Sequence, residues 1–312
     1  MRLLLIDGHY YAYRSFHAIR ELSNSRGEPT NAIFGFAKSV RLMLKHLAPD
    51  FAAVVWDDGM PKRRTELQPQ YKQNRAEMPD LMRPQMDFLY SMVPRMGLHG
   101  LSLPDTEADD LIGSYAHAAA ERGIEAILAT NDKDLLALAN KHVRIYSTAK
   151  ADLASPDEAF ALLDATAVEK KWGVRPDRIH EVLALTGDSV DNIPGVPGVG
   201  PKTAAALVLE HGTIRDMLAH PERIKNEKLR AKIVAAADQI RQNREMVRLD
   251  DDLPLPKPIE ALTVEPDYPA LIADLENAEF RGLTAEYRAE SERVGETKKK
   301  KKSGTEQTEM PF

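Results

Sequence analysis

The sequence predicts an α/β protein with a mainly parallel central sheet flanked by helices, followed by a smaller helical region. Three short apolar runs, "LLLID", "FAAVVWD" and "EAILATND", are separated by helix-period sequence such as "NAIFGFAKSVRLMLKHL" at 31–47. Apolar runs that alternate with amphipathic helices are typical of buried parallel strands. A further candidate strand is "HVRIYST" at 142–148.

Composition limits the class of protein. The 312 residues are 43% hydrophobic and 29% charged, which is ordinary for a globular chain. The chain has no cysteine, which excludes disulfides, zinc–thiolate sites and thiol catalysis. The opening "MRLLLID" is too short in apolar residues for a signal peptide, and no later run has the length of a membrane span. We therefore expect a cytoplasmic protein without a membrane partner.

Each of the three apolar runs ends in an acid, at Asp7, Asp57 and Asp132. In open α/β sheets the ligand crevice lies beyond the carboxyl ends of the strands. A single aspartate after a strand is usually a turn residue, but three such runs point to one shared site. Asp58, next to Asp57, is read as a turn residue.

The segment "TEADDLIGSYAHAAAE" at 106–121 gathers three acids at the start of a helix, Glu107, Asp109 and Asp110. Thr106 and Asp109 fit a capping box, and acids in the first turn complement the helix dipole. We therefore expect Thr106 to cap the helix. Capping explains one or two of the acids but not the third, because adjacent carboxylates repel.

A basic stretch follows Asp57. From residue 60 to about 85 the chain has prolines at 61, 69, 79 and 84, little apolar periodicity and many Lys and Arg residues. We expect an exposed, partly helical excursion; the alternative is a solvated loop. Tyr71 beside Lys72 adds an aromatic side chain of the kind that nucleic-acid contacts use.

A second region begins near residue 175 and contains "IPGVPGVGPKTA". Gly195 and Gly200 have Walker A spacing, but Pro201 precedes Lys202 and Thr203, so we exclude a nucleotide-hydrolysing loop. A helix–hairpin–helix fits better. Its glycines, with Gly198 among them, let the backbone approach a phosphate, and the next helix offers its N-terminal N–H groups. Such a hairpin grips duplex backbone without reading bases.

The acids of these motifs suggest a two-metal site. The set is Asp7, Asp57, Glu107, Asp109, Asp110, Asp132, Asp134, Asp188 and Asp191. Mg²⁺ favours oxygen ligands, and two ions about 3.5–4 Å apart can clamp the attacking and leaving oxygens of a phosphodiester. The net charge of −6 becomes +3 without these nine acids, which is compatible with a basic DNA track around an acidic pocket.

These motifs together resemble the bacterial 5′–3′ exonuclease and flap endonuclease family, which includes the N-terminal nuclease domain of bacterial DNA polymerase I. The resemblance rests on "LLLIDGHYYAYRSFHA", "VVWDDGMPKRR", "YKQNR", "TEADDLIGSYA", "TNDKDLLAL" and "LTGDSVDNIPGVPGVGPKTA", in family order from about residue 1 to 285. It implies a PIN-like nuclease core at 1–174 with a helical arch at about 60–95, and a DNA-binding region at 175–289. The latter would contain the family's H3TH form of the hairpin.

The resemblance also implies roles for residues. Asp7, Asp57, Glu107, Asp109 and Asp110 match the first metal cluster, and the other four acids match the second. Lys72 and Arg75 match the residues that touch the scissile phosphate, with Tyr71 and Arg14 as supporting contacts. His9 and His17 are expected to be structural or substrate-positioning residues.

The implied activity is hydrolysis of DNA at 5′ flaps, nicks or 5′ ends by a free-standing, monomeric enzyme in replication and repair. Its cofactors would be two Mg²⁺ ions, with Mn²⁺ as the substitute, and a K⁺ ion at the hairpin. Two alternatives stay open at this point. One is a DNA-junction-binding module with vestigial metal sites, and the other is a ribonuclease on the same core.

The end of the sequence is a lysine-rich tail, expected to be disordered from about residue 290. Gln307, Met310 and Phe312 form a Q-x-x-[LM]-x-F pattern that resembles the peptides with which bacterial replication proteins dock on the sliding clamp. A basic tether with an apolar anchor would raise the local concentration of the enzyme at DNA. The alternative is a tail without this use.

Overall fold

The structure is a computed structural model that describes residues 1–155 and 157–305, with side chains described through residue 296. The chain divides into two compact units. Among the described residues, the first comprises 1–10, 49–77 and 101–262, and the second comprises 11–48, 78–100 and the described part of the chain after 262. All nine predicted metal-binding acids belong to the first unit.

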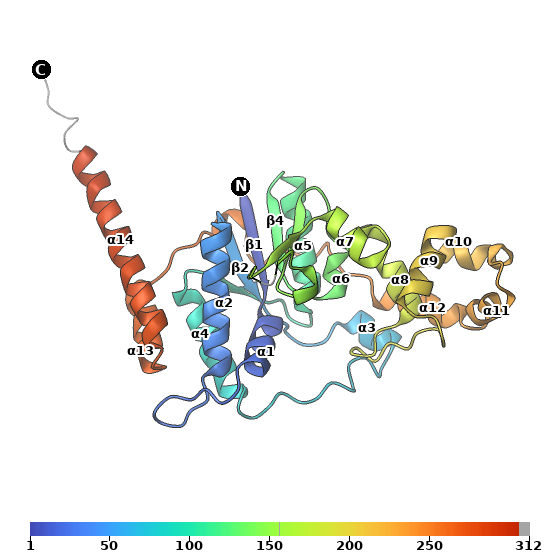
Figure 1. Cartoon of the computed structure of the whole chain (residues 1–312), viewed down its shortest axis with the longest axis horizontal. Coiled ribbons are helices and arrows are strands. Elements are labelled where there is room, and N and C mark those ends of the chain that lie inside the picture. Colours follow the sequence, from blue (N-terminus) through green and yellow to red (C-terminus); the bar gives the residue numbers. More distant parts are fainter. Residues whose placement is uncertain (156, 306–312) are drawn as a thin grey trace, which may run out of the picture. The chain divides into compact units, whose positions relative to one another are not determined.

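A six-stranded sheet has the strand order β3-β2-β1-β4-β5-β6. Its strands are β1 Arg2–Asp7, β2 Phe51–Val55, β3 His99–Leu101, β4 Glu125–Ala129, β5 Val143–Ser147 and β6 Ala161–Leu163. Strand β1 pairs in parallel with β2 and β4, β4 pairs in parallel with β5, and β6 is antiparallel to β5 (Figure 1). The predicted mainly parallel sheet is therefore confirmed. Strands β3 and β6 escaped prediction because three residues are too few for a periodic pattern.

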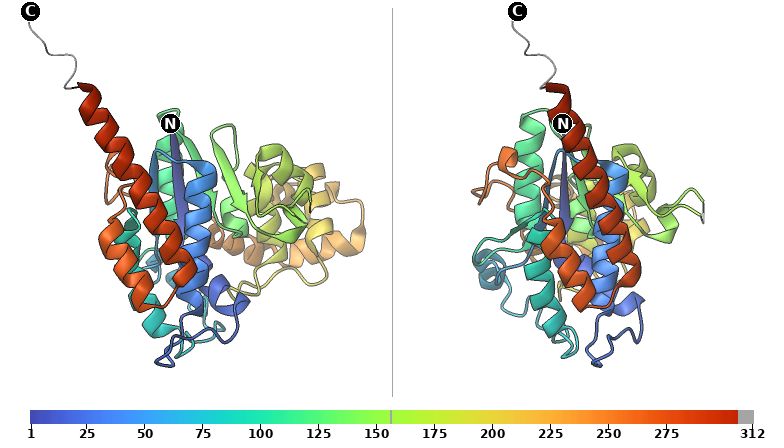
Figure 2. Two further views of the ribbon diagram at one scale, coloured as in Figure 1. Left: turned by 60° about the vertical axis from the view of Figure 1, so that its left-hand side comes forward. Right: turned by 90° about the vertical axis from the view of Figure 1, so that its left-hand side faces the viewer.

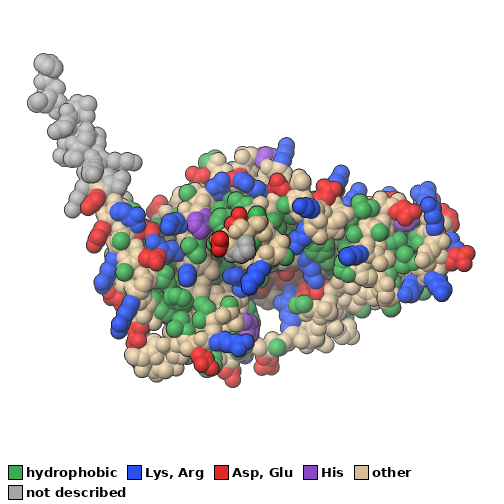
Figure 3. All heavy atoms as spheres, viewed as in Figure 1, with side chains coloured by type: hydrophobic (Ala, Val, Ile, Leu, Met, Phe, Trp, Pro, Cys, Tyr) green, Lys and Arg blue, Asp and Glu red, His purple; other side chains and the backbone are tan. Residues whose placement is uncertain are grey.

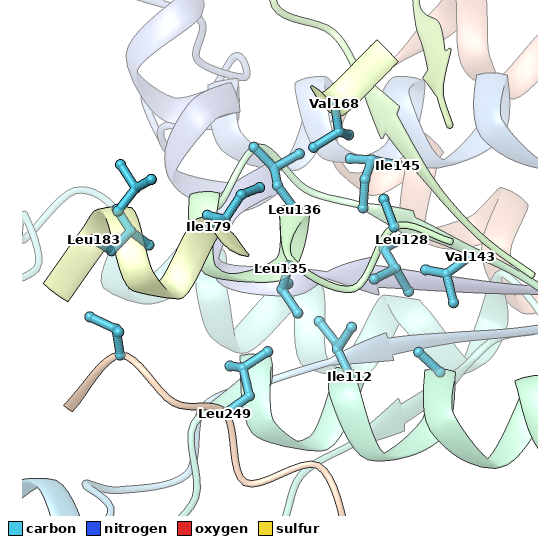
Figure 4. Close-up of a cluster of buried hydrophobic side chains, with 14 of the residues drawn as sticks. Ile112, Leu128, Leu135, Leu136, Val143, Ile145, Val168, Ile179, Leu183 and Leu249 are labelled. Carbon is cyan, nitrogen blue, oxygen red and sulfur yellow. The ribbon is translucent and has the colours of Figure 1, made fainter. Parts of the chain in front are cut away.

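The buried centre of the sheet explains the apolar runs. Residues 3–6 of β1 are fully buried, and β1 aligns Leu4 with Ala52 of β2 and with Ile127 of β4. Parallel strands covered on both faces need apolar side chains at every position, not at every second one. Figure 4 shows the adjoining cluster, in which Leu128, Ile112 and Leu135 lie close together. This core anchors the loop that carries Asp132 and Asp134.

Ten helices lie in the first unit or cross its boundary among the described residues, apart from short 3₁₀ turns. They are α1 Gly8–Ala18, α3 Lys62–Leu67, α5 Ala108–Glu121, α6 Lys133–Leu136, α7 Ala165–Trp172, α8 Ile179–Thr186, α9 Pro201–His211, α10 Ile214–Ala219, α11 Glu227–Ala235 and α12 Ala237–Met246. Helix α8 packs on both α9 and α12 (Figure 1). The α8–loop–α9 sequence is the predicted helix–hairpin–helix.

The second unit is helical in its described part. It contains α2 Asn31–Leu47, α4 Arg83–Arg95, α13 Tyr268–Asn277 and α14 Arg281–Thr305. Helices α13 and α14 lie side by side (Figure 2). The structure continues α14 to Thr305, whereas composition predicts disorder from about residue 290. Lys, Glu and Arg are good helix formers, so a charged stretch that adjoins a packed helix can prolong it. Among the described residues, no helix has the length and apolar character to cross a membrane.

Candidate active site

Asp7 closes strand β1 and is held by two hydrogen bonds. Its Oδ1 accepts the backbone N–H of Tyr10 at 2.9 Å, and its Oδ2 accepts the hydroxyl of Thr130 at 3.2 Å. The Thr130 oxygen in turn accepts the N–H of Asp132 at 3.0 Å. Thr130 therefore links the carboxylate at the end of β1 to the one that follows β4. Sequence reasoning missed Thr130, although its place in "TND" beside a predicted ligand was the available signal.

Asp57 follows β2 and caps helix α5. Its Oδ1 accepts the N–H of Ala108, the first residue of that helix, at 2.8 Å. The prediction that Thr106 caps α5 is wrong, because the Thr106 hydroxyl donates to the carbonyl of Pro104 and the N-cap residue is Glu107. The Asp57 carboxylate, which follows strand β2, is stabilised at the N-terminus of α5 because the positive end of the helix dipole attracts negative charge.

Arg64 of α3 forms a buried ion-pair network with the start of α5. Its Nη1 and Nη2 each lie 2.7 Å from an oxygen of Asp110, and its Nη1 also contacts the Glu107 carboxylate. The Asp250 N–H donates to Asp110 at 2.9 Å. One guanidinium thus pairs with two of the three acids in "TEADD". Sequence reasoning missed Arg64 because "PKRR" reads as an exposed basic run, whereas Arg64 is only 3% exposed.

Tyr71, Lys72 and Arg75 converge on two acids. The Lys72 ammonium contacts Glu107 and lies 3.9 Å from Asp191 Oδ2. Arg75 Nη2 lies 2.5 Å from Asp191 Oδ1. The sequence suggested that Tyr71 touches nucleic acid, but its side chain is buried and its hydroxyl lies 3.1 Å from Glu107 Oε1 and 3.3 Å from Asp191 Oδ2. The structure thus gives the Tyr71 hydroxyl two partners inside the protein, and through them Tyr71 helps to position both carboxylates.

A second group of acids gathers around the short helix α6. Asp132 is its N-cap residue and accepts the N–H of Asp134 at 2.8 Å. Asp134 Oδ1 is buried and has no hydrogen-bond partner among the described residues. Asp188 Oδ2 lies 2.7 Å from the Lys133 ammonium, and the Asp188 backbone pairs with Ile193. An orphaned buried carboxylate oxygen is costly, and a cation is the group that would satisfy it.

Electrostatics shows that acids from separate motifs share one neighbourhood. Burial raises the pKa of Asp7 to about 7, against the Tyr10 hydrogen bond, and the charges of Asp57 and Asp132 add to the rise. Burial also raises the pKa of Asp109 well above its usual range, and Asp132 and Asp7 are its strongest acidic neighbours. Four carboxylates on four predicted motifs therefore repel one another across a common space.

The second group shows the same effect. Burial raises the pKa of Asp134 well above its usual range, and the charges of Asp132, Asp188 and Asp191 raise it further. Burial raises the pKa of Asp132 as well, with Asp191 among the contributing charges. Asp132 therefore belongs to both groups and joins them.

The donor set fits hard divalent cations, since every candidate ligand is a carboxylate oxygen and one oxygen is orphaned. Over the described ranges, however, no three such side chains lie together in a geometry that would hold an ion as they stand. Several of the acids pair with basic side chains, which are those of Arg64, Lys72, Arg75 and Lys133. Asp7, Asp109 and Asp132, by contrast, repel one another, and Asp132 also repels Asp134.

The remaining residues predicted in the first motif lie on α1. His9 Nδ1 is 3.1 Å from Asp57 Oδ2; burial would raise the pKa of Asp57, but the His9 contact outweighs it and lowers that pKa to about 2. This agrees with a structural role for His9. Arg14 and His17 belong to the second unit, where the Arg14 guanidinium lies 6.0 Å from the centre of the Tyr11 ring.

The hairpin between α8 and α9 shows two uses of glycine. A Cβ on Gly195 would lie 2.0 Å from the carbonyl oxygen of Thr186, so this glycine is needed for internal packing. Gly198 has φ +76°, and a Cβ there would meet the Lys232 ammonium at 2.7 Å. Gly200, the N-cap residue of α9, faces open space. Lys202 is exposed on the first turn of α9, and its neighbour Thr203 is half-buried.

Lys232 is a residue that sequence reasoning missed. It lies on α11, thirty-odd residues after the hairpin in sequence, so no local motif connects the two. Figure 3 shows that Lys and Arg side chains project at several points from the region of α9–α12, among Asp and Glu side chains. The tail residues Gln307, Met310 and Phe312 lie outside the described residues.

Comparison with known protein families gives a match along most of the chain. Residues 2–173 match the family described as 5′–3′ exonuclease, N-terminal resolvase-like domain, and residues 174–270 match 5′–3′ exonuclease, C-terminal SAM fold. A 5′–3′ exonuclease of Aquifex aeolicus is 34% identical over 285 residues, which cover 91% of this chain and 94% of that protein. The thermostable DNA polymerase I of Thermus aquaticus is 38% identical over 286 residues.

The polymerase match covers 92% of this chain but 33% of the polymerase, so the chain spans about a third of the length of the polymerase I relatives it matches. Two solved structures share the fold. T5 5′-exonuclease with bound divalent metal ions (zinc) has a TM-score of 0.66 at 19% identity, covering 80% of this chain and 90% of that one. The catalytic core of Rad2 with DNA substrate has a TM-score of 0.61 at 17% identity, covering 89% and 87%.

Proposed function

Because the chain belongs to the 5′–3′ exonuclease family, we propose that it is a structure-specific 5′ nuclease that hydrolyses DNA phosphodiesters at 5′ flaps, nicks or 5′ ends, with a role in primer removal during replication and in repair. The observation that carries this proposal is the electrostatic coupling among the buried carboxylates of Asp7, Asp109, Asp132 and Asp134. Neighbouring acids pair with the basic side chains of Arg64, Lys72, Arg75 and Lys133. Repelling buried carboxylates need cations, and a phosphodiester needs both cations and positive side chains.

We propose two divalent cations, Mg²⁺ or Mn²⁺, as the cofactors. When bound, they would supply a nucleophile at neutral pH and neutralise charge on the phosphate. Asp7, Asp109, Asp132 and Asp134 are the residues that would hold them, since the first three repel one another and Asp132 also repels Asp134. Support also comes from T5 5′-exonuclease, whose structure carries divalent metal ions.

The chain's own basic residues supply the electrostatic part of the reaction. Lys72 and Arg75 lie on one short segment and both contact Asp191. A phosphate bound beside Asp191 would therefore contact an ammonium and a guanidinium together. Burial alone would lower the pKa of Lys72, but the charges of Glu107 and Asp191 outweigh it and raise that pKa. Lys72 therefore stays charged throughout the neutral range and can stabilise negative charge that develops on the phosphoryl oxygens.

The hairpin and its neighbours would hold the duplex. The N-terminus of α9 offers unpaired N–H groups behind Gly200, with Lys202 exposed on its first turn. Lys232 adds a cation beside Gly198. We propose that this surface contacts phosphates without reading bases, with a K⁺ ion as a further ligand of the hairpin. The support from a relative is the Rad2 core, whose structure contains DNA substrate.

The test is cleavage of a 5′-flap DNA in Mg²⁺ with product sizes read on a gel, alongside the variant Asp134→Asn. We expect short 5′ products from the parent protein and a loss of at least about 100-fold in the variant, on the scale of a removed metal ligand or its support, with flap binding kept. An inactive parent that still binds the flap would favour a junction-binding module. Faster cleavage of a matched RNA flap would favour a ribonuclease.

Three further parts of the proposal concern the whole protein. We propose that it acts as a monomer in the cytoplasm, and that Gln307, Met310 and Phe312 dock on a sliding clamp. Deletion of residues 306–312 should abolish binding to the clamp without changing cleavage of a free flap. Unchanged clamp binding after the deletion contradicts the docking proposal, and sedimentation of the purified chain checks the monomer.

A further inference from the structure

We propose that Gln68, Asn74 and Asn192 are positioning residues that hold Lys72 and Arg75 in register with the loop before the glycine hairpin. This inference rests on the proposed function, because the consequence of the register is the placement of two cations at the reacting phosphate. Their side-chain amides bridge two segments of the first unit, residues 68–75 and 189–192, and we call these bridges the amide ladder.

The bonds of the amide ladder follow the chain in order. Gln68 Nε2 donates to the carbonyl of Asn192 at 2.5 Å, and Asn192 Nδ2 donates back to the carbonyl of Gln70 at 2.7 Å. At the far end, Asn74 Nδ2 donates to the carbonyl of Ser189 at 2.7 Å. The residue numbers of the bonded partners rise in one segment and fall in the other, so the two segments run antiparallel. Each amide bond is therefore compatible with one alignment of the two segments.

Lys72 lies in the middle of the ladder. Its backbone N–H donates to the carbonyl of Asp191 at 3.1 Å, between the rungs made by Asn192 and Asn74. Lys72 and Asn192 have φ angles of 57° and 60°, in the left-handed region that side-chain-bearing residues rarely adopt. Such conformations persist where surrounding contacts over-determine them. The ladder is the set of contacts that does so here.

The other three contacts of the two segments do not by themselves define a register. Tyr71 has hydroxyl contacts of 3.1–3.3 Å to three carboxylate oxygens, and Arg75 and Lys72 reach Asp191 through long, flexible side chains. The Tyr71 hydroxyl is shared among several oxygens, and the long side chains of Lys72 and Arg75 can follow Asp191 over a range of backbone positions. The amide-to-carbonyl bonds of 2.5–2.7 Å are made by shorter side chains, so they weaken when one segment slides past the other.

The loop on which the ladder rests is rigid. Asp188 and Ile193 exchange two backbone hydrogen bonds, at 2.8 and 2.7 Å. A Cβ on Gly187 would lie 2.4 Å from the Gly195 nitrogen, and a Cβ on Gly195 would lie 2.0 Å from the carbonyl oxygen of Thr186. The loop and the start of the hairpin therefore move as one body. Duplex held at the hairpin is in this way coupled to the position of Lys72.

The test uses Asn74→Ala and Asn192→Gly. Asn74 is exposed, so its truncation leaves the core intact, and glycine at 192 keeps the positive φ while removing the amide. The matched control is Gln73→Ala, because Gln73 is an exposed amide of the same segment whose bond, to the Pro69 carbonyl at 2.9 Å, stays within it. Two readouts are taken: hydrogen exchange over residues 69–76, and single-turnover flap cleavage in Mg²⁺.

We expect exchange at 69–76 to rise about tenfold in both variants and to stay unchanged in Gln73→Ala, as the loss of one net hydrogen bond implies. The single-turnover rate should fall about tenfold while flap affinity stays the same. In a background that lacks both basic side chains, Lys72→Ala with Arg75→Ala, adding Asn74→Ala should cost nothing more, because a positioning residue acts only through the residues it positions.

Two results would overturn the inference. One is unchanged exchange over 69–76 in both variants, which would mean that the ladder does not order the segment. The other is a full additional loss of rate when Asn74→Ala is added to the background without Lys72 and Arg75, which would mean that Asn74 acts independently. If the parent protein cleaves no 5′ flap, the proposed function fails, and the exchange experiment still decides on the ladder.

Discussion

Replacing Arg64 by alanine should strongly destabilise the first unit. The guanidinium makes two hydrogen bonds of 2.7 Å to Asp110 and contacts Glu107, and it donates to the carbonyls of Met246 and Arg248 at 3.1 and 3.0 Å. Its side chain is 4% exposed and that of Asp110 is 2% exposed. The substitution therefore removes a charged partner from two buried carboxylates and leaves two carbonyls without this donor.

The size of the stability loss depends on which carboxylate stays buried without a charged partner after the substitution. Removing one partner of a buried ion pair costs about 3–5 kcal/mol, because the other charge stays buried without compensation. Asp110 keeps only the Asp250 N–H at 2.9 Å, whereas Glu107 keeps Lys72 and Tyr71. We therefore expect a loss of about 3–5 kcal/mol in the free energy of unfolding, most of it from Asp110.

The assay is urea unfolding of the parent and three variants, followed by far-UV circular dichroism. Lys62→Ala is the control, since Lys62 lies two residues away in an exposed pair with Asp105 at 3.5 Å and should change stability by less than about 0.5 kcal/mol. Arg64→Ala with Asp110→Asn should regain part of the loss because the stranded charge is gone. If Arg64→Ala behaves like Lys62→Ala, the ion-pair reasoning is refuted.

Three other predictions concern pH, packing and DNA binding. Because burial raises the pKa of Asp7 from 3.8 to about 7 in the folded state, metal-free protein should lose stability as pH rises from about 4 to 7, where unfolding releases a proton that the folded state still holds. Asp7→Asn should flatten this slope in thermal melts, and an unchanged slope contradicts the assignment. Gly195→Ala should cost about 1–3 kcal/mol in urea unfolding, since its Cβ would overlap the Thr186 carbonyl, whereas Gly200→Ala, in open space, should be near neutral; equal effects would contradict the packing argument. Lys232→Ala should lower the slope of log affinity against log salt for flap DNA by about 1, and an unchanged slope would remove Lys232 from the DNA surface.

The acids of the site were predictable because each lies in a local pattern. Asp7 ends one buried parallel strand and Asp132 comes shortly after another. The near-continuous apolar sequence of such strands is visible without any tertiary information, and parallel strands bring their carboxyl ends to one edge of the sheet. The resemblance to the family motifs predicted that Lys72 and Arg75 belong to the same site as the acids. In the structure both side chains contact Asp191.

The pairing of these charges was not predictable in the same way. "PKRRTEL" does not distinguish Arg64, which is buried, from Lys62, which is exposed, because a helix of six residues presents no periodic apolar face. The internal partners of Tyr71 were not predictable either, because they are distant in sequence. Its burial depends on Glu107 and Asp191, which lie 36 and 120 residues away.

Sequence by itself predicted which residues would carry the chemistry and on which strands and turns they lie, since backbone conformation and the period of apolar residues are local properties. Tertiary structure alone decided how the charges are compensated: that Asp57 and not Thr106 caps α5, that Arg64 neutralises Asp110, and that an amide ladder sets the register of Lys72. The physical reason is that a buried charge is stabilised by whichever donor the fold brings within about 3 Å. That donor can come from any part of the chain.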